Sequence, residues 1–175
     1  RFYFRFLENR QEQLALGIQE QALAEISKHL IDFIGTYTWE EICREWTLRA
    51  GAKGELPYLP DQVGSAWNAK AQIDVVGYNS MDKTLILGEC KWTRNTNKPK
   101  IIKELIEKKV NRIVPKEGNW EIFFTGFSRS GWTPNALVYE NQITEELPSG
   151  INWSTSGIRL VDLDQLDQDL QKWTA

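Results

Sequence analysis

Two neighbouring segments read Gln72-Ile73-Asp74-Val75-Val76-Gly77-Tyr78 and Thr84-Leu85-Ile86-Leu87-Gly88-Glu89-Cys90-Lys91-Trp92. Each segment carries apolar residues on both of its alternating faces, which is typical of central strands covered on both sides of a sheet. The turn between the two segments is expected at residues 80–83. The sequence therefore predicts an antiparallel hairpin at the centre of a sheet.

Three charged residues interrupt this apolar hairpin. Asp74 and Glu89 lie equally far from the middle of the turn, so a regular hairpin makes them direct cross-strand neighbours, with Cβ atoms about 5 Å apart. Lys91 is two residues beyond Glu89 and therefore projects from the same face. The sequence predicts two carboxylates and one ammonium group on one face of the sheet.

This arrangement is typical of a divalent metal site. Charges beside apolar neighbours are costly unless they are paired, and two adjacent carboxylates repel each other unless a cation lies between them. Mg²⁺ or Mn²⁺ would take these oxygen ligands, polarise a phosphate and lower the pKa of a bound water. Lys91 would position that water or offset charge on the phosphoryl group. The alternative is a salt bridge between Lys91 and Glu89 without catalysis, since so short a pattern recurs by accident.

The segments around the hairpin give the order α-β-β-β-α-β from Thr36 to Phe127. Gly35 is expected to end the preceding helical stretch, and Thr36 or Thr38 to cap a new helix that runs to about Ala50. The other expected elements are strands over 63–69, 72–78, 84–92 and 120–127, a helix over 97–113, a short helix over 135–142, a strand over 158–163 and a helix over 163–173.

The N-terminal segment is expected to form a strand followed by helices. Phe2, Phe4 and Phe6 alternate with polar or larger amphipathic residues, which predicts a short strand with one apolar edge. Residues 8–34 show helical periodicity, and Gly17 divides them into two helices. We expect residues 1–35 to pack on a main domain of residues 36–175 as a single compact unit. The chain begins with Arg1, so we interpret it as a fragment of a longer protein.

The composition excludes several classes of protein. Two cysteines and one histidine are too few for a disulfide framework or a Cys/His zinc site, so we expect a reducing, cytoplasmic environment. No apolar run approaches the roughly 20 residues of a membrane span. The net charge of −3 does not attract nucleic acid to the whole molecule, although a local basic face is compatible with it.

One such basic segment runs from Lys91 to Lys116, with nine lysines and arginines against two glutamates. It is either a phosphate-binding surface beside the metal site or a solvated helix face with pairs such as Glu104–Lys108. Its closeness to Lys91 favours phosphate contact. The residues predicted to bind nucleic acid are Arg94, Lys98, Lys100 and Lys103.

Ile73-Asp74, followed by Gly88-Glu89-Cys90-Lys91-Trp92, resembles the signature of the PD-(D/E)XK nuclease superfamily. Further segments resemble the domain of unknown function at the C-terminus of archaeal-type DEXX-box ATPases. They are Tyr3-Phe4-Arg5-Phe6, Trp39-Glu40-Glu41-Ile42-Cys43-Arg44-Glu45, Gly64 to Trp67, and Ile73-Asp74-Val75-Val76. The chain departs from these patterns at Asn68, where a second tryptophan is usual, and at Ile73, where proline is usual. It also has no Gln-x-x-x-Tyr motif after the signature.

The resemblance implies an α/β, restriction-endonuclease-like core with a central mixed sheet flanked by helices. It assigns Asp74 and Glu89 as metal ligands, Lys91 as the catalytic lysine, and Glu40 as an acidic residue that approaches the metal; by position alone, Glu41 is an equal candidate. The implied activity is Mg²⁺- or Mn²⁺-dependent hydrolysis of phosphodiester bonds, in DNA, within a larger ATPase. The alternatives are a silent nucleic-acid-binding module and a protein-interaction domain, with the oligomeric state left open.

Overall fold

The computed structural model describes residues 1–174, and the contacts within the chain divide it into two compact units. The first comprises residues 1–41 and the second begins at Ile42. The boundary predicted from the sequence lies near residue 35, and the expected packing of the N-terminal segment on the core stays a prediction. None of the helices in the described residues has the length and hydropathy of a membrane span.

The first unit is helical. Its elements are the π-helical turn η1 (Tyr3–Leu7), the 3-10 turn η2 (Glu8–Arg10), α1 (Gln11–Ala15), α2 (Gln19–Phe33), the π-helical turn η3 (Ile34–Thr38) and the start of α3 (Trp39–Ala52). Gly17 separates α1 from α2, as predicted, with a φ of +76°. Glycine adopts this left-handed conformation without steric cost, so the chain can reverse here.

The predicted N-terminal strand is wrong, because the segment forms the helical turn η1. A helical turn brings Phe2 and Phe6 to the same side, with ring centroids 5.1 Å apart. Both rings also contact Phe33 of α2, at 6.0 and 5.2 Å. These aromatic contacts are absent from an isolated strand, and they stabilise the helical conformation despite the strand-like alternation of phenylalanines.

The predicted helix break at Gly35 is also wrong, because η3 continues α2 and leads directly into α3. Ile34 and Trp39, at the two junctions, have right-handed helical backbone angles. The hydroxyl of Thr36 donates to the carbonyl of Asp32, 2.8 Å away, and does not cap a new helix. A glycine inside a helix costs only about 1 kcal/mol relative to alanine, so the flanking helical residues outweigh it.

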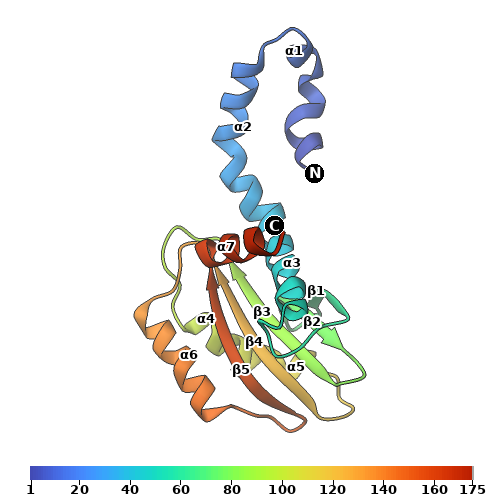
Figure 1. Cartoon of the computed structure of the whole chain (residues 1–175), viewed down its shortest axis with the longest axis vertical. Helices are drawn as coiled ribbons and strands as arrows, with labels where there is room; N and C mark the ends of the chain where they lie inside the picture. Colours follow the sequence, from blue (N-terminus) through green and yellow to red (C-terminus); the bar gives the residue numbers. More distant parts are fainter. Residues whose placement is uncertain (175) are drawn as a thin grey trace. The chain divides into compact units, whose positions relative to one another are not determined.

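The second unit contains one mixed sheet (Figure 1). Its strands are β1 (Gln62–Trp67), β2 (Gln72–Asn79), β3 (Thr84–Lys91), β4 (Trp120–Ser128) and β5 (Trp153–Asp162), in the spatial order β1-β2-β3-β4-β5. β1, β2 and β3 pair in antiparallel fashion, whereas β3, β4 and β5 are parallel. The hairpin predicted at the centre of the sheet is β2–β3.

Helices connect the parallel strands. One helical segment, made of α4 (Lys100–Glu104), η4 (Leu105–Lys109) and α5 (Val110–Ile113), joins β3 to β4. The helix α6 (Pro134–Glu146) joins β4 to β5, and α7 (Leu163–Thr174) follows β5. The predicted order α-β-β-β-α-β is confirmed. The fold is α/β with a five-stranded mixed sheet flanked by helices, consistent with the restriction-endonuclease-like arrangement.

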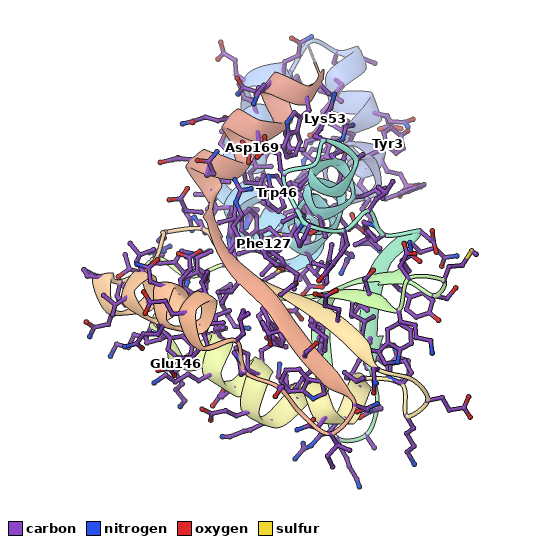
Figure 2. The ribbon with its side chains drawn as sticks, turned by 60° about the horizontal axis from the view of Figure 1, so that its bottom comes forward. Tyr3, Trp46, Lys53, Phe127, Glu146 and Asp169 are labelled. Atoms are coloured by element: carbon purple, nitrogen blue, oxygen red, sulfur yellow. The ribbon has the colours of Figure 1, made fainter. Side chains whose placement is uncertain are left out.

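Both faces of this sheet are covered. On one face, Ile102, Leu105, Ile106 and Val110 pack with Leu85, Leu87, Ile122 and Phe124. Phe127 lies three residues beyond Phe124 and so points to the opposite face, where Trp46 of α3 meets it edge-on at 5.5 Å. The indole of Trp46 donates to Oδ2 of Asp169 in α7, at 2.9 Å (Figure 2). The strands that carry Asp74, Glu89 and Lys91 are therefore held between a helical layer on each face of the sheet.

Candidate active site

The hairpin brings Asp74, Glu89 and Lys91 together. Its register ends with Val75 opposite Gly88, and Asp74 and Glu89 are the next residues on the two strands, just beyond this last pair. The two acidic residues are only 7% and 3% exposed. Lys91 follows on the same face, and its ammonium lies 3.5 Å from Oε2 of Glu89. The juxtaposition predicted from the spacing is thus present in the structure.

Backbone and side-chain donors hold Asp74 in place. Its Oδ2 atom accepts a hydrogen bond from the backbone N–H of Cys90 at 3.0 Å, across the hairpin. Its Oδ1 atom has a longer contact, 3.4 Å, with the side-chain amide of Gln72. The guanidinium of Arg44, in α3, donates to the carbonyl oxygen of Asp74 at 2.8 Å. One carboxylate oxygen is therefore firmly bonded and the other is only weakly engaged.

Glu89 has a second partner that the sequence analysis did not include in the site. The ammonium of Lys109 lies 2.6 Å from Oε1 of Glu89, closer than that of Lys91. Lys109 ends the π-helical turn η4, and single π turns within α-helices occur frequently at functional sites. The sequence did hold a signal: Lys109 is four residues after Leu105 and three after Ile106, on their buried face.

The electrostatics of Glu89 reflect these neighbours. Burial raises the pKa of its carboxyl above the usual value, and the charge of Asp74 raises it further. The hydrogen bond from Lys109 and the charges of both lysines act in the opposite direction. Burial has the largest effect, so the ionised carboxylate is held at a cost in free energy that a nearby cation reduces.

The donor set fits a hard divalent cation. Among the described residues, Oδ1 of Asp74 and Oε2 of Glu89 have only the long contacts of 3.4 and 3.5 Å, which leave one oxygen on each carboxylate suited to a metal ligand. Within the described residues, no group of three or more His, Cys, Asp or Glu side chains is placed to hold a metal ion. Mg²⁺ is commonly bound by one or two carboxylates, with waters and substrate phosphates completing its coordination.

Glu40 belongs to the first unit, in the first turn of α3, whereas Asp74 and Glu89 belong to the second. Its predicted approach to the metal stays a prediction. The alternative candidate, Glu41, pairs with Arg1 at 2.8 Å on the surface of the first unit.

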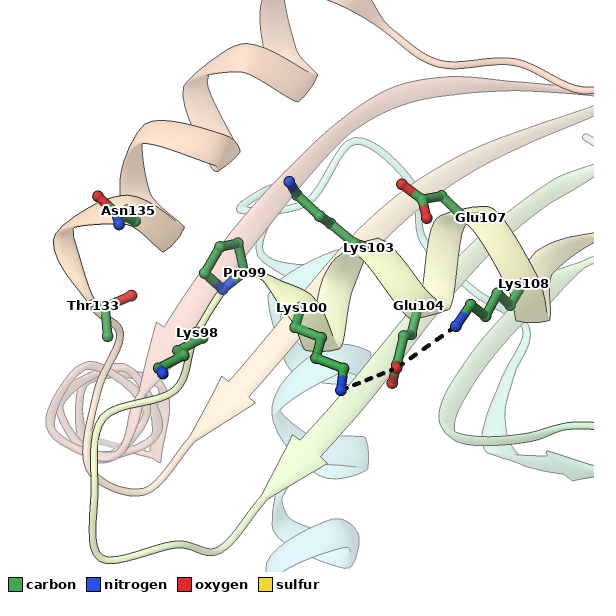
Figure 3. Close-up of a pocket in the computed structure, with 9 residues that line it drawn as sticks. All are labelled: Lys98, Pro99, Lys100, Lys103, Glu104, Glu107, Lys108, Thr133 and Asn135. Carbon is green, nitrogen blue, oxygen red and sulfur yellow. Dashed lines mark ion pairs between the residues drawn. The ribbon is translucent and has the colours of Figure 1, made fainter.

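A basic groove lies between the start of α4 and the start of α6 (Figure 3). Three of the four residues predicted to bind nucleic acid line it, together with two polar residues of the opposite wall: Lys98, Lys100, Lys103, Thr133 and Asn135. Arg94 is exposed in the loop that leads from β3 to α4. Because α4 and α6 begin after the carboxyl ends of β3 and β4, the groove lies toward the end of the sheet that carries Lys91.

The charge of this groove is partly balanced. Glu104 lies 3.8 Å from both Lys100 and Lys108. The ammonium of Lys103 lies over the ring of Tyr139, 4.8 Å from its centroid. These contacts are exposed and therefore weak, so the lysines remain able to bind phosphate groups.

A comparison with protein families agrees with the resemblance to a domain of unknown function. The model of DUF234, described as archaea bacterial proteins of unknown function, matches residues 3–113. This span is more than half of the 175 residues, and it includes Asp74, Glu89, Lys91 and Lys109. No curated protein and no solved structure matches the chain.

Proposed function

The chain belongs to DUF234, a family of unknown function, and we propose that it is a metal-dependent nuclease-like domain that hydrolyses phosphodiester bonds in DNA. The observation that carries the proposal is the pair of buried carboxylates, Asp74 and Glu89, which follow the last paired residues of β2 and β3, with Lys91 beside Glu89. The resemblance to the PD-(D/E)XK signature implies a site at the same three residues.

Each of these residues has a role that its position supports. Asp74 and Glu89 would hold Mg²⁺ or Mn²⁺, which when bound polarises a phosphate oxygen and lowers the pKa of a coordinated water. The side chain of Lys91 is 36% exposed, so its ammonium reaches both Glu89 and a ligand arriving from solvent. It would orient the attacking water and offset the negative charge that develops on the phosphoryl group.

The basic groove supports a nucleic-acid substrate. Lysines that contact phosphates position a duplex or a single strand without reading its sequence. Lys98, Lys100 and Lys103 offer such contacts close to the carboxyl end of β3, and Arg94 lies in the loop between them and Lys91. A strand bound in the groove would therefore continue toward the two carboxylates.

A second candidate function is binding of nucleic acid without cleavage. Its support is the charge balance of the site: two carboxylates, Asp74 and Glu89, are accompanied by two ammonium groups, Lys91 and Lys109. The two ammonium groups offset the two carboxylate charges without any metal, which suits a module that binds nucleic acid and does not cleave it.

The resemblance also implies a larger polypeptide. We propose that this domain follows an ATPase domain in the same chain and works in the cytoplasm.

Incubation of the protein with supercoiled and single-stranded DNA, in the presence of Mg²⁺ or Mn²⁺, tests the proposal. We expect cleavage by the wild type, and none by Asp74→Asn or Lys91→Met. Asp82→Asn is the matched control, since Asp82 lies in the turn at the other end of the same hairpin and should leave cleavage unchanged. Metal-dependent binding without cleavage by the wild type would favour the second candidate.

A further inference from the structure

Lys109 takes a position that is unusual for a lysine on this helical segment. Its neighbour Lys108 is exposed and pairs with Glu104 on the helix surface, whereas Lys109 turns inward to the sheet. The side chain of Lys109 is only 27% exposed, and its ammonium makes the shortest ion pair of the site, 2.6 Å to Glu89. Lysine side chains are mostly exposed, so the inward orientation of Lys109 beside a nearly buried carboxylate indicates a specific role.

Charge balance explains this role. Without Lys109, the buried pair of Asp74 and Glu89 would face a single ammonium, that of Lys91 at 3.5 Å. Two adjacent carboxylates with one cation are costly in a desolvated setting. Lys109 provides a second ammonium group at Glu89 and offsets more of the carboxylate charge when no metal is bound.

A metal ion at Glu89 meets this ammonium whichever oxygen it takes. An ion on Oε1 competes with Lys109 directly, since both would need the same lone pairs. An ion on Oε2 lies within about 5 Å of it, where a single and a double positive charge still repel strongly. Metal binding and the Lys109–Glu89 ion pair therefore oppose each other.

We propose that Lys109 is the built-in counterion of this site, which holds Glu89 in the absence of metal and withdraws when a divalent ion binds. The inference rests on the proposed metal site and adds a positioning residue to it. Lys109 has a long, flexible stem and is partly exposed, so its ammonium can swing toward solvent. The affinity for metal then depends on competition between the Lys109 ammonium and the divalent ion for Glu89. At low ion concentration the site stays ordered by Lys109 and is inactive.

Mn²⁺ titration by calorimetry at pH 8, on the purified 175-residue protein and its variants, tests this competition. Lys109→Met should bind Mn²⁺ about tenfold more tightly than the wild type, because the opposing charge is gone. Lys109→Arg, which keeps the charge, and Lys108→Met, which removes an exposed charge one residue away, should both stay within about twofold of the wild type.

The outcomes separate the inference from the function on which it rests. Equal affinity for Lys109→Met and the wild type would overturn the counterion and leave the metal site intact. Weaker binding by Lys109→Met would also overturn it, and would mean that Lys109 orients Glu89 toward the metal. Absence of Mn²⁺ binding in both proteins would overturn the metal site itself, and the counterion with it.

A measurement on the wild type does not depend on the variants folding. Acetic anhydride labels accessible lysines, and mass spectrometry reports the labelled fraction of each. Lys109 should be labelled several-fold faster in Mn²⁺ than in EDTA, because it has withdrawn from Glu89, while Lys108 should be labelled equally in both. Equal labelling of Lys109 in the two conditions would overturn the withdrawal.

Discussion

Removing the positive charge of the basic groove should change how the binding of DNA responds to salt. Replacing Lys98, Lys100 and Lys103 with glutamine keeps the side chains polar and the helix propensity similar. Each lysine that neutralises a phosphate of B-DNA contributes about 0.9 to the slope of log affinity against log salt. If all three lysines contact phosphates, the triple variant loses about 2.7 from the slope.

Contacts of the three lysines in the structure set a range for the expected decrease of this slope. Lys100 shares Glu104 with Lys108, and Lys103 lies over Tyr139, so neither is as available as Lys98. We therefore expect a decrease of the slope between about 1 and about 2.7. At the upper value, a fourfold rise in salt would weaken the wild type about 40-fold more than the variant.

Fluorescence anisotropy with a labelled duplex in EDTA, between 50 and 200 mM salt, measures the slope without cleavage. The matched control replaces three exposed lysines outside the segment from Lys91 to Lys116, namely Lys28, Lys53 and Lys83. The control should keep the wild-type slope. An unchanged slope in the groove variant, or an equal decrease in the control, would remove the groove from the DNA interface.

Two predictions concern stability, both measured by urea unfolding in EDTA. Glu89→Gln should be more stable than the wild type at pH 8. Burial and the charge of Asp74 raise the pKa of Glu89, so the wild type loses folding stability as the pH rises through this raised pKa and the carboxyl ionises. Glutamine does not ionise, so the variant keeps its stability at pH 8. The advantage should vanish toward pH 4, and a less stable variant at pH 8 would mean that the Lys109 ion pair outweighs burial. Gly88→Ala should cost about 1–3 kcal/mol, because a Cβ there meets the Thr125 hydroxyl at 2.3 Å and Val75 at 3.1 Å. Gly64→Ala, with open space around its Cβ, should be neutral, and equal effects of the two would contradict the packing at Gly88.

Local patterns were sufficient for the centre of the fold. The hairpin and its register follow from apolar strands on either side of a short turn, so the meeting of Asp74 and Glu89 depended only on nearby residues. The crossover segment was predicted over residues 97–113 and is helical from Lys100 to Ile113. Its apolar periodicity is long enough to distinguish a helix from a strand.

Features that depend on distant contacts were not predictable in the same way. The prediction of an N-terminal strand was wrong because the spacing of Phe2 and Phe6 fits one face of a helix as well as one face of a strand. Their contacts with the ring of Phe33 favour the helix. The strand predicted from residue 158 begins at Trp153. Residues 154–157 are polar or glycine, so they lack the apolar alternation of a strand. Gly157 has a φ of +141° and lies where the pairing of β5 with β4 is irregular.

Lys109 shows the same limit for the site. Its position on a buried helix face is visible in the sequence, but its partner is 20 residues away on another element. Only the packing of the crossover helix on β3 decides whether that lysine points to a carboxylate or lies along the surface. Groups brought together by tertiary packing are therefore easier to miss than those on a single hairpin.

Titration of Mn²⁺ into the wild type and into the Asp74→Asn/Glu89→Gln double variant tests the metal site most directly. Calorimetry should detect binding to the wild type at a site that the double variant lacks, while both proteins remain folded, since amides replace the carboxylates with little change of shape. Equal binding by both proteins, or none by the wild type, would contradict a metal site at this hairpin. Asp74, Glu89 and their two lysines would then be a buried ion-pair network.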